Sequence, residues 1–166
     1  MSAVSYVKEY AANDTRQFLT FKLAGEEYGV GILAVKEIRG WSAVTAMPHA
    51  PRWMLGVINL RGVVVPVIDL RLKLDFERAE YNDYTVVIVV SVGDLLAGIV
   101  VDAVSDVIML STADIKPPPS LGNQADTSHI IGFGTADGRM RILLDIERLL
   151  AGTELSTANA LQQESK

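Results

Sequence analysis

The sequence predicts an all-β protein: two small five-stranded β-barrels packed together, with helices limited to the termini and short connections. Three observations lead to this fold class. Short apolar runs rich in β-branched residues alternate with tight turns, the turn residues recur at a fixed spacing, and neither half of the chain contains a long helical pattern. A small sheet leaves exposed edges unless it curls shut, so barrels are expected.

Four pairs of runs have the pattern of β-hairpins, each bounded by Gly, Asp or Glu. They pair 18–23 with 28–33, 56–60 with 63–70, 85–92 with 95–101, and 130–134 with 139–146. Pro66 cannot donate a ladder hydrogen bond, so its strand is expected at an edge or with a bulge. Weak helices are expected near the N-terminus and after residue 145.

The hairpins form two matching sets. In the second hairpin of each set, corresponding residues are 76 positions apart: Gly56 and Gly132, Gly62 and Gly138, Asp69 and Asp145. The segment Val35 to Ile38 similarly resembles Val104 to Val107. A diverged tandem duplication of a unit of roughly 70 residues is predicted.

The expected organisation is an N-terminal segment 1–16, a β domain 17–150 with subdomains of about 17–80 and 81–150, and a helical tail 151–166. The terminal segments could cross between the subdomains. A groove is expected where the two barrels meet.

The composition excludes several classes of function. The net charge of −5 disfavours nucleic acid as the main partner, and zero cysteines exclude thiolate metal sites and disulfides. The apolar tract 85–101 is interrupted at Gly93, so no membrane insertion is expected. Charges at Lys8 and Glu9 argue against a signal peptide, so a cytoplasmic location is expected.

No catalytic or cofactor site is predicted. The glycine pattern at 29–34 lies inside a hairpin rather than before a helix, which argues against a dinucleotide site. His49 and His129 lack further ligands at metal spacing. Asp126, Ser128 and His129 contain triad residue types but no nucleophile elbow. We therefore expect no enzyme, no metal and no cofactor.

The charges in GVINLRGVVVPVIDLR (56–71) remain to be explained. An ion pair between Glu37 and Arg61 on neighbouring strands is expected, and an exposed pair would contribute only about 0.2–1 kcal/mol. Two interpretations stay open: the pair orients a binding surface, or it belongs to an ordinary solvated strand face.

The runs FLTFKLAGEEYGV, VKEIRG, GVINLRGVVVPVIDLR, GIVVDAVSDV and IKPPP resemble, in this order and spacing, the CheW-type coupling proteins of bacterial chemotaxis. The resemblance covers roughly positions 17 to 150. It implies a pair of five-stranded barrels, without catalysis, that links the cytoplasmic hairpin tips of methyl-accepting chemoreceptors to the regulatory domain of the histidine kinase CheA in membrane-associated arrays. Weak self-association within arrays is also considered.

The resemblance also implies site residues. Receptor-binding positions in or beside the groove are Val35, Glu37, Gly56, Val57, Asn59, Leu60, Arg61, Val86 and Val104. Kinase-binding positions, assigned more loosely, are Ile38, Arg39, Val44 and Leu121. Gly56 is expected to allow close approach of the partner, so Gly56→Asp should cut receptor binding and leave the fold intact.

The alternative from another class is a small-ligand-binding β-barrel sensor or an enzyme accessory protein. It would use the groove as a pocket, with Asn59, Glu37 and Arg61 as its polar groups.

Overall fold

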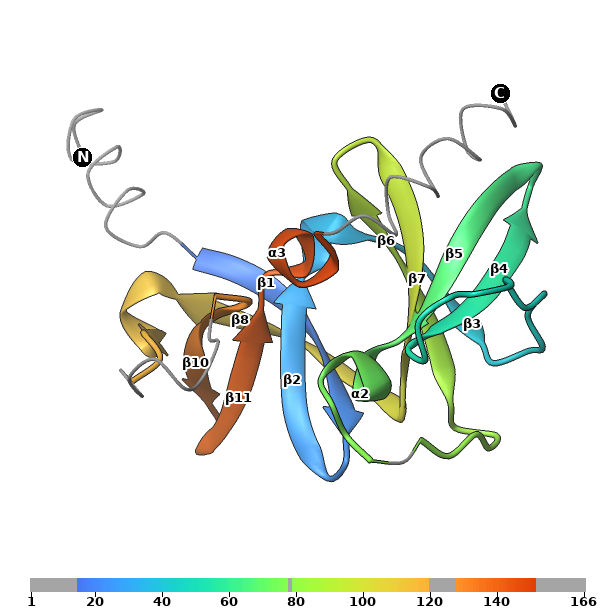
Figure 1. The fold of residues 1–166 in the computed structure, drawn as a ribbon. Helices are drawn as coiled ribbons and strands as arrows, with labels where there is room; N and C mark the ends of the chain where they lie inside the picture. The colour runs from blue at the N-terminus through green and yellow to red at the C-terminus, as the bar shows by residue number, and fades with distance from the viewer. Residues whose placement is uncertain (1–14, 78, 120–127, 152–166) are drawn as a thin grey trace.

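The computed structural model describes residues 15–77, 79–119 and 128–151 (Figure 1). Its elements are β1 (Thr15–Leu23), β2 (Glu26–Gly31), η1 (Ile32–Ala34), β3 (Val35–Gly40), β4 (Met54–Leu60), β5 (Val63–Asp69), α2 (Leu70–Lys73), β6 (Val86–Val92), β7 (Leu95–Val101), β8 (Ala103–Ser111), η2 (Thr112–Asp114), β9 (Ile115–Lys116), β10 (Ile130–Ala136), β11 (Arg139–Leu144) and α3 (Ile146–Leu150). The predicted N-terminal segment and helical tail lie almost entirely outside the described residues.

The predicted all-β class and all four hairpins are confirmed. The hairpins are β1–β2, β4–β5, β6–β7 and β10–β11, each antiparallel. Among the described residues, the helices are short: η1, α2 and η2 connect strands, and α3 follows the last strand. No helix in the described part of the chain is long and apolar enough to cross a membrane.

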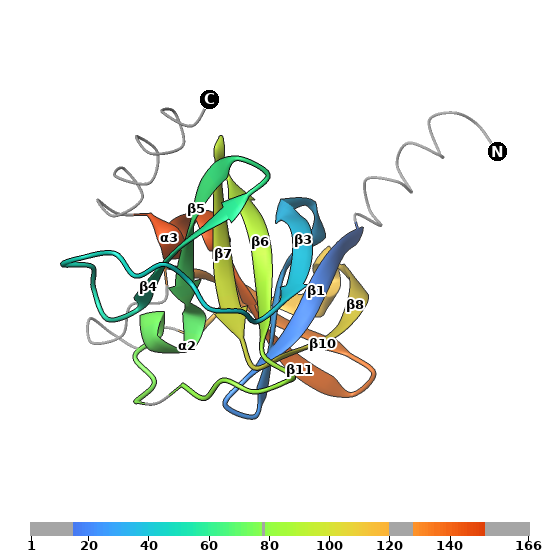
Figure 2. The same ribbon diagram turned by 90° about the vertical axis from the view of Figure 1, so that its right-hand side faces the viewer.

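The strands form two sheets, in the orders β8-β1-β2-β11-β10-β9 and β3-β6-β7-β5-β4. Each sheet takes one hairpin from the first half of the sequence and the other hairpin from the second half. The sheets therefore do not coincide with a division of the chain near residue 80. Figures 1 and 2 show the two sheets packed against each other.

The prediction of two five-stranded barrels was wrong in one respect: the sheets do not close into barrels. Both sheets are open, because the first and last strands of each order are not paired with each other. Thr45 forms an isolated bridge with Val57 on the edge of β4, and β9 pairs at the equivalent place on β10. Because β9 is two residues long and the Thr45 bridge is only one, the first sheet has six strands and the second has five.

Irregularities in the ladders repeat at matching places, as the predicted duplication requires. The register shifts between Met54 and Gly56 in β4, and again 76 positions later between Ile130 and Gly132 in β10. The bulges in β3 and β8 likewise fall at equivalent positions, Lys36 and Ser105. Bulges are specific features of a strand rather than random defects, so their repetition supports a duplicated unit.

Pro66 lies in β5, which is an interior strand. The register shift of the β4–β5 pair falls between Met54 and Gly56 rather than at Pro66, so neither predicted setting, an edge or a bulge, is found there. Val57, opposite Pro66, uses its own N–H and C=O with Thr45, on the far side of β4. Pairing of β5 with β7 begins only at Val67. The missing N–H of Pro66 is thus tolerated, because no ladder bond is required there.

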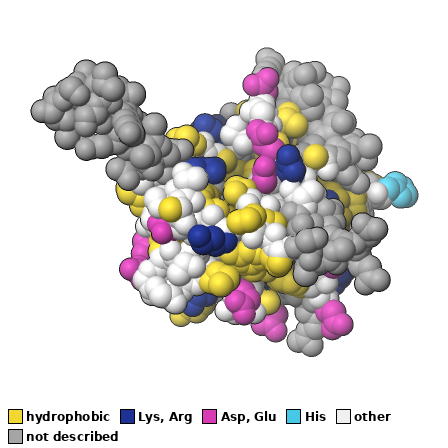
Figure 3. Space-filling model, turned by 90° about the vertical axis from the view of Figure 1, so that its left-hand side faces the viewer, with side chains coloured by type: hydrophobic (Ala, Val, Ile, Leu, Met, Phe, Trp, Pro, Cys, Tyr) yellow, Lys and Arg dark blue, Asp and Glu magenta, His cyan; other side chains and the backbone are white. Residues whose placement is uncertain are grey.

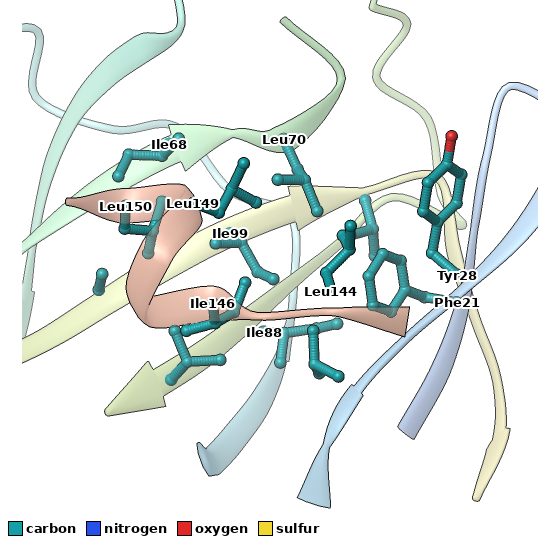
Figure 4. Packing of buried hydrophobic residues seen from close by; sticks show 14 of the residues in the cluster. Phe21, Tyr28, Ile68, Leu70, Ile88, Ile99, Leu144, Ile146, Leu149 and Leu150 are labelled. Carbon is teal, nitrogen blue, oxygen red and sulfur yellow. The ribbon is translucent and has the colours of Figure 1, made fainter. Parts of the chain in front are cut away.

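The largest hydrophobic core is shared by the two sheets. It contains Phe21 and Tyr28 from one sheet, Ile88 and Ile99 from the other, and α3 residues such as Ile146 (Figure 4). Smaller clusters fill the inner side of each curled sheet. The shared core makes the two sheets one packed unit.

Candidate protein-binding surface

The sheets meet along a strip of half-buried apolar residues, which we call the seam. Ile32, Val35, Val86 and Val104 are partly exposed and pack against the shared core. η1 contacts β1 of one sheet and β6 of the other, so it lies where the two sheets meet. Three of the predicted receptor-binding valines therefore lie where the two sheets come together.

Val35 and Val104 are equivalent in the duplication. Both lie directly before the bulge of their strand, one on β3 and the other on β8. Both strands are sheet edges. The seam is therefore flanked by the same structural feature on each side.

A second group of predicted residues gathers at the turn between β4 and β5. Arg61 donates through Nη2 to Oε1 of Glu37 at 3.0 Å, and Arg39 Nε lies 3.4 Å from the other carboxylate oxygen. The side chain of Asn59 accepts from the N–H of Gly62 and stabilises the turn, while Leu60 is buried in the inner cluster.

The predicted ion pair between Glu37 and Arg61 is confirmed, but not between neighbouring strands. β3 and β4 are the two opposite edges of the five-stranded sheet. The sheet curls until its edges face each other, and the ion pair joins them. At the equivalent positions of the other repeat stand Asp106 and Asp137, both acidic. The fold therefore does not require an ion pair at this place.

The prediction that Gly56 is needed to make room for a partner was wrong. Gly56 is buried with φ +153°, and a Cβ there would lie 2.1 Å from the backbone oxygen of Thr45. The close approach that requires glycine is thus made by the chain itself. Gly56→Asp cannot leave this part of the fold intact, contrary to the prediction.

The predicted kinase-binding residues lie beside the predicted receptor-binding ones. Arg39 and Val44 line a depression of about 260 Å³ together with Val57 and Asn59. The structure thus brings the two groups together on the five-stranded sheet. Leu121 lies outside the described residues.

Val107 is the equivalent, in the other repeat, of the predicted kinase-binding residue Ile38. Both stand on edge strands, and 47% of Ile38 and 45% of Val107 are exposed. Val107 was not chosen, although the match of Val35–Ile38 to Val104–Val107 could have identified it. Met109 and Met140 of the six-stranded sheet are also exposed. Figure 3 shows apolar side chains over the centre of the face that lies on the left in Figure 1.

Sequence reasoning also missed a buried polar network centred on Arg71. Its Nε and Nη2 donate to the two carboxylate oxygens of Asp69, each at 2.9 Å. Nη1 donates to Oδ1 of Asp102 at 2.7 Å and to the backbone oxygen of Glu80. Burial lowers the pKa of Arg71, but its bonds to Asp69 and Asp102 outweigh this and raise it overall. Arg71 therefore remains charged.

Tyr81 completes the network. It donates to Asp69 Oδ2 and stacks on Trp41, with the ring centroids 4.6 Å apart. Burial is the largest cause that raises the pKa of Tyr81, from 10.0 to about 12. The hydrogen bond to Asp69 and the negative charge of Asp69 also raise this pKa, while Arg71 lowers it.

This pKa shift predicts an alkaline transition. The folded state holds the phenolic proton of Tyr81 more tightly than the unfolded state does. The stability that this proton contributes is therefore complete below about pH 10 and is lost as the pH rises towards 12. A difference titration at 295 nm between wild type and Tyr81→Phe should show one phenol ionising near pH 12. Asp69→Asn should lower that midpoint, and an unchanged midpoint would contradict the assignment.

The fold and these surfaces define an all-β binding module whose predicted site residues lie along the seam and on the five-stranded sheet. The chain belongs to the CheW-like domain family, whose model matches residues 17–154. It is 44% identical over 157 residues to the chemotaxis protein CheW of Klebsiella aerogenes, covering 94% of this chain and 95% of that protein.

Two further comparisons agree. The chain is 38% identical over 150 residues to the chemotaxis protein CheW of Rhizobium meliloti, covering 90% of this chain and 97% of the other. The crystal structure of the scaffolding protein TtCheW from Thermoanaerobacter tengcongensis superposes with a TM-score of 0.76 at 32% identity, covering 82% of this chain and 93% of that one.

Proposed function

We propose that this protein is a non-catalytic adaptor of bacterial chemotaxis, which couples the cytoplasmic tips of chemoreceptors to the histidine kinase CheA. The observation that carries the proposal is the seam. An apolar strip between two sheets fits one face of an amphipathic helix, and receptor tips are helical hairpins. The chain is similar to proteins named chemotaxis protein CheW, and the family resemblance implies that this helix belongs to a receptor tip.

The surface around Arg39, Val44 and Ile38 is the proposed contact for the regulatory domain of CheA. Its position next to Val57 and Asn59 means that receptor and kinase would bind close to each other on the five-stranded sheet. Recruitment to membrane-associated arrays would follow from receptor binding, and the affinity within an array would come from several modest contacts.

Charge exchange between Glu37 and Arg61 tests the receptor part of the proposal. Either single change, Glu37→Arg or Arg61→Glu, should weaken binding of a receptor hairpin fragment in calorimetry by severalfold, because like charges would then meet where the sheet edges join. The double variant should recover only part of the loss, since Arg39 would then repel the arginine introduced at position 37. The stability of each variant should change by no more than about 1 kcal/mol.

Asp137→Arg is the matched control. It changes the charge at the equivalent turn of the other repeat, where no ion pair joins Asp106 and Asp137. Its receptor affinity should equal that of the wild type. A double variant that binds no better than the single variants would refute a role for the pair in binding.

The ligand-sensor alternative has less support. Its three polar residues do not converge: Asn59 lines the depression of about 260 Å³, while Glu37 and Arg61 are not among its lining residues. Small-molecule sites typically have about 300–1,000 Å³ and a few polar groups aimed at one point.

A further inference from the structure

Asp102 lies at the point where the chain passes from one sheet to the other. It is the single residue between β7 of the five-stranded sheet and β8 of the six-stranded sheet. Its N–H donates to the backbone oxygen of Lys22 at 3.0 Å, and its Oδ2 accepts from the N–H of Ala24 at 2.7 Å. Asp102 is thereby fixed to the β1–β2 hairpin of the six-stranded sheet.

The second carboxylate oxygen reaches the other sheet. Oδ1 accepts from Nη1 of Arg71, which follows β5 and is held by Asp69 at the end of that strand. Arg71 has only 3% of its side chain exposed, and no buried side-chain polar atom in the described residues lacks a hydrogen bond. Arg71 and Asp102 therefore form a rigid link between the two sheets.

This link lies at one end of the seam. Asp102 precedes Val104 by two residues, and Thr85, which lines the same cavity as Arg71 and Asp102, directly precedes Val86. Val104 thus follows closely on a residue that the network holds in place, while Val86 follows a residue that borders the same cavity. We expect a change in the link to affect Val104 first.

The opposite end of the seam lacks this link. By the repeat spacings of 76 and 69, Arg71 corresponds to Glu147 and Asp102 to Leu33. Glu147 and Leu33 line a depression of about 240 Å³, together with Ser91 from one sheet and Ile131 from the other. Leu33 is 92% exposed. One end of the seam is therefore joined by an ion pair, while the other is an open depression.

We propose that Arg71 and Asp102 are positioning residues that fix the angle between the two sheets and so keep the seam in the shape that accepts a receptor helix. The proposal rests on the proposed function for its partner, but its structural part does not. The link adds a fixed connection at one end of the seam to the packing of the core that the two sheets share. An ordered seam also reduces the conformational entropy lost when the helix binds.

The test uses the full chain, which contains no cysteine, so pairs of labels can be introduced freely. Asp94→Cys in the β6–β7 turn and Met140→Cys in β11 place spin labels on exposed sites of the two different sheets. Asp102→Ala breaks the link but leaves the Arg71–Asp69 pair, so the fold should persist. We expect a broader distribution of label distances and at least tenfold weaker binding of a receptor hairpin fragment.

Arg141→Met is the control for loss of a buried cation. Arg141 is 1% exposed and bonds Glu27, but both residues lie within the six-stranded sheet. This variant should lose stability while the label distances and the receptor affinity of the folded protein stay unchanged. Arg71→Lys keeps the charge. Its distribution of label distances and its receptor affinity should lie between those of the wild type and those of Asp102→Ala.

The outcomes separate the two proposals. An unchanged distance distribution in Asp102→Ala would refute the positioning role, whatever happens to receptor binding. A broadened distribution with wild-type affinity would also refute it. If the wild type itself failed to bind the receptor fragment, the proposed function would fail, while the distance measurement would still decide whether Asp102 fixes the sheets.

Discussion

Replacing Gly56 with alanine is expected to lower the free energy of unfolding by about 3 kcal/mol or more, since it combines backbone strain with overpacking. Gly56 has φ +153°, and its added Cβ would lie 2.1 Å from the oxygen and 2.7 Å from the carbonyl carbon of Thr45. Thr45 cannot move away without loss, because it exchanges two backbone hydrogen bonds with Val57. Urea unfolding followed by tryptophan fluorescence measures the effect.

Gly62→Ala is the control that isolates the steric part. Gly62 also has positive φ, +89°, but nothing lies within 4 Å of the Cβ it would gain. It should therefore lose only about 1 kcal/mol, from backbone strain alone. Equal losses in the two variants would show that the approach of Thr45 is not the cause.

This result would change how a Gly56 variant is interpreted in a binding assay. Weaker receptor binding by Gly56→Asp would reflect displacement of the segment around Thr45, which lines the same depression as Arg39 and Val44. It would not show that the glycine itself contacts the receptor. Glu37 and Arg61 are better probes, because their side chains are at least partly exposed.

Local features of the fold could be predicted from the sequence. The four hairpins follow from turn residues and short β-branched runs, which act over a few positions. The spacing makes Asp69 and Asp145 equivalent, and each accepts a backbone hydrogen bond at the start of a short helix. Spacing alone therefore identified the repeated unit.

The assembly of the sheets could not be predicted in the same way. β1 pairs with β8, about ninety positions later, because the first hairpin of each repeat joins the sheet of the other repeat. Two equivalent units offer the same edges, so the local sequence does not say which unit a hairpin joins. The segments that pair with the edges of β4 and β10 are also short, and a single bridge at Thr45 has no detectable pattern.

The polar network was missed for a related reason. Arg71 and Asp69 stand out as charges in an apolar run, but their partners Tyr81 and Asp102 come from a loop and from the crossing between sheets. Only the fold brings these four residues together. A charge in an apolar run therefore indicates a buried partner without identifying it.

The second large effect is expected at Asp69. Asp69 is fully buried and accepts hydrogen bonds from the backbone and guanidinium of Arg71 and from Tyr81. Asp69→Ala would leave the buried charge of Arg71 without its main partner, so a loss of about 3–5 kcal/mol in the free energy of unfolding is expected. Chemical denaturation at neutral pH measures it.

The duplication provides the control for this prediction. Asp145 occupies the equivalent position and accepts from the N–H of Arg148, but its ion pair with Arg148 is exposed. Asp145→Ala should therefore lose only the helix cap, about 1 kcal/mol.

The double variant Asp69→Ala with Arg71→Met separates charge burial from packing. Removing both charges leaves no fully buried unpaired ion, because the carboxylate of Asp102 is 35% exposed and still accepts from the N–H of Ala24. The double variant should therefore be more stable than Asp69→Ala alone, as replaced buried ion pairs often are. If it were less stable, the effect of Asp69 would come from the cap and from Tyr81 rather than from the charge of Arg71. In that case the remaining bonds of Arg71, to Asp102 and to the backbone oxygen of Glu80, would themselves stabilise the fold.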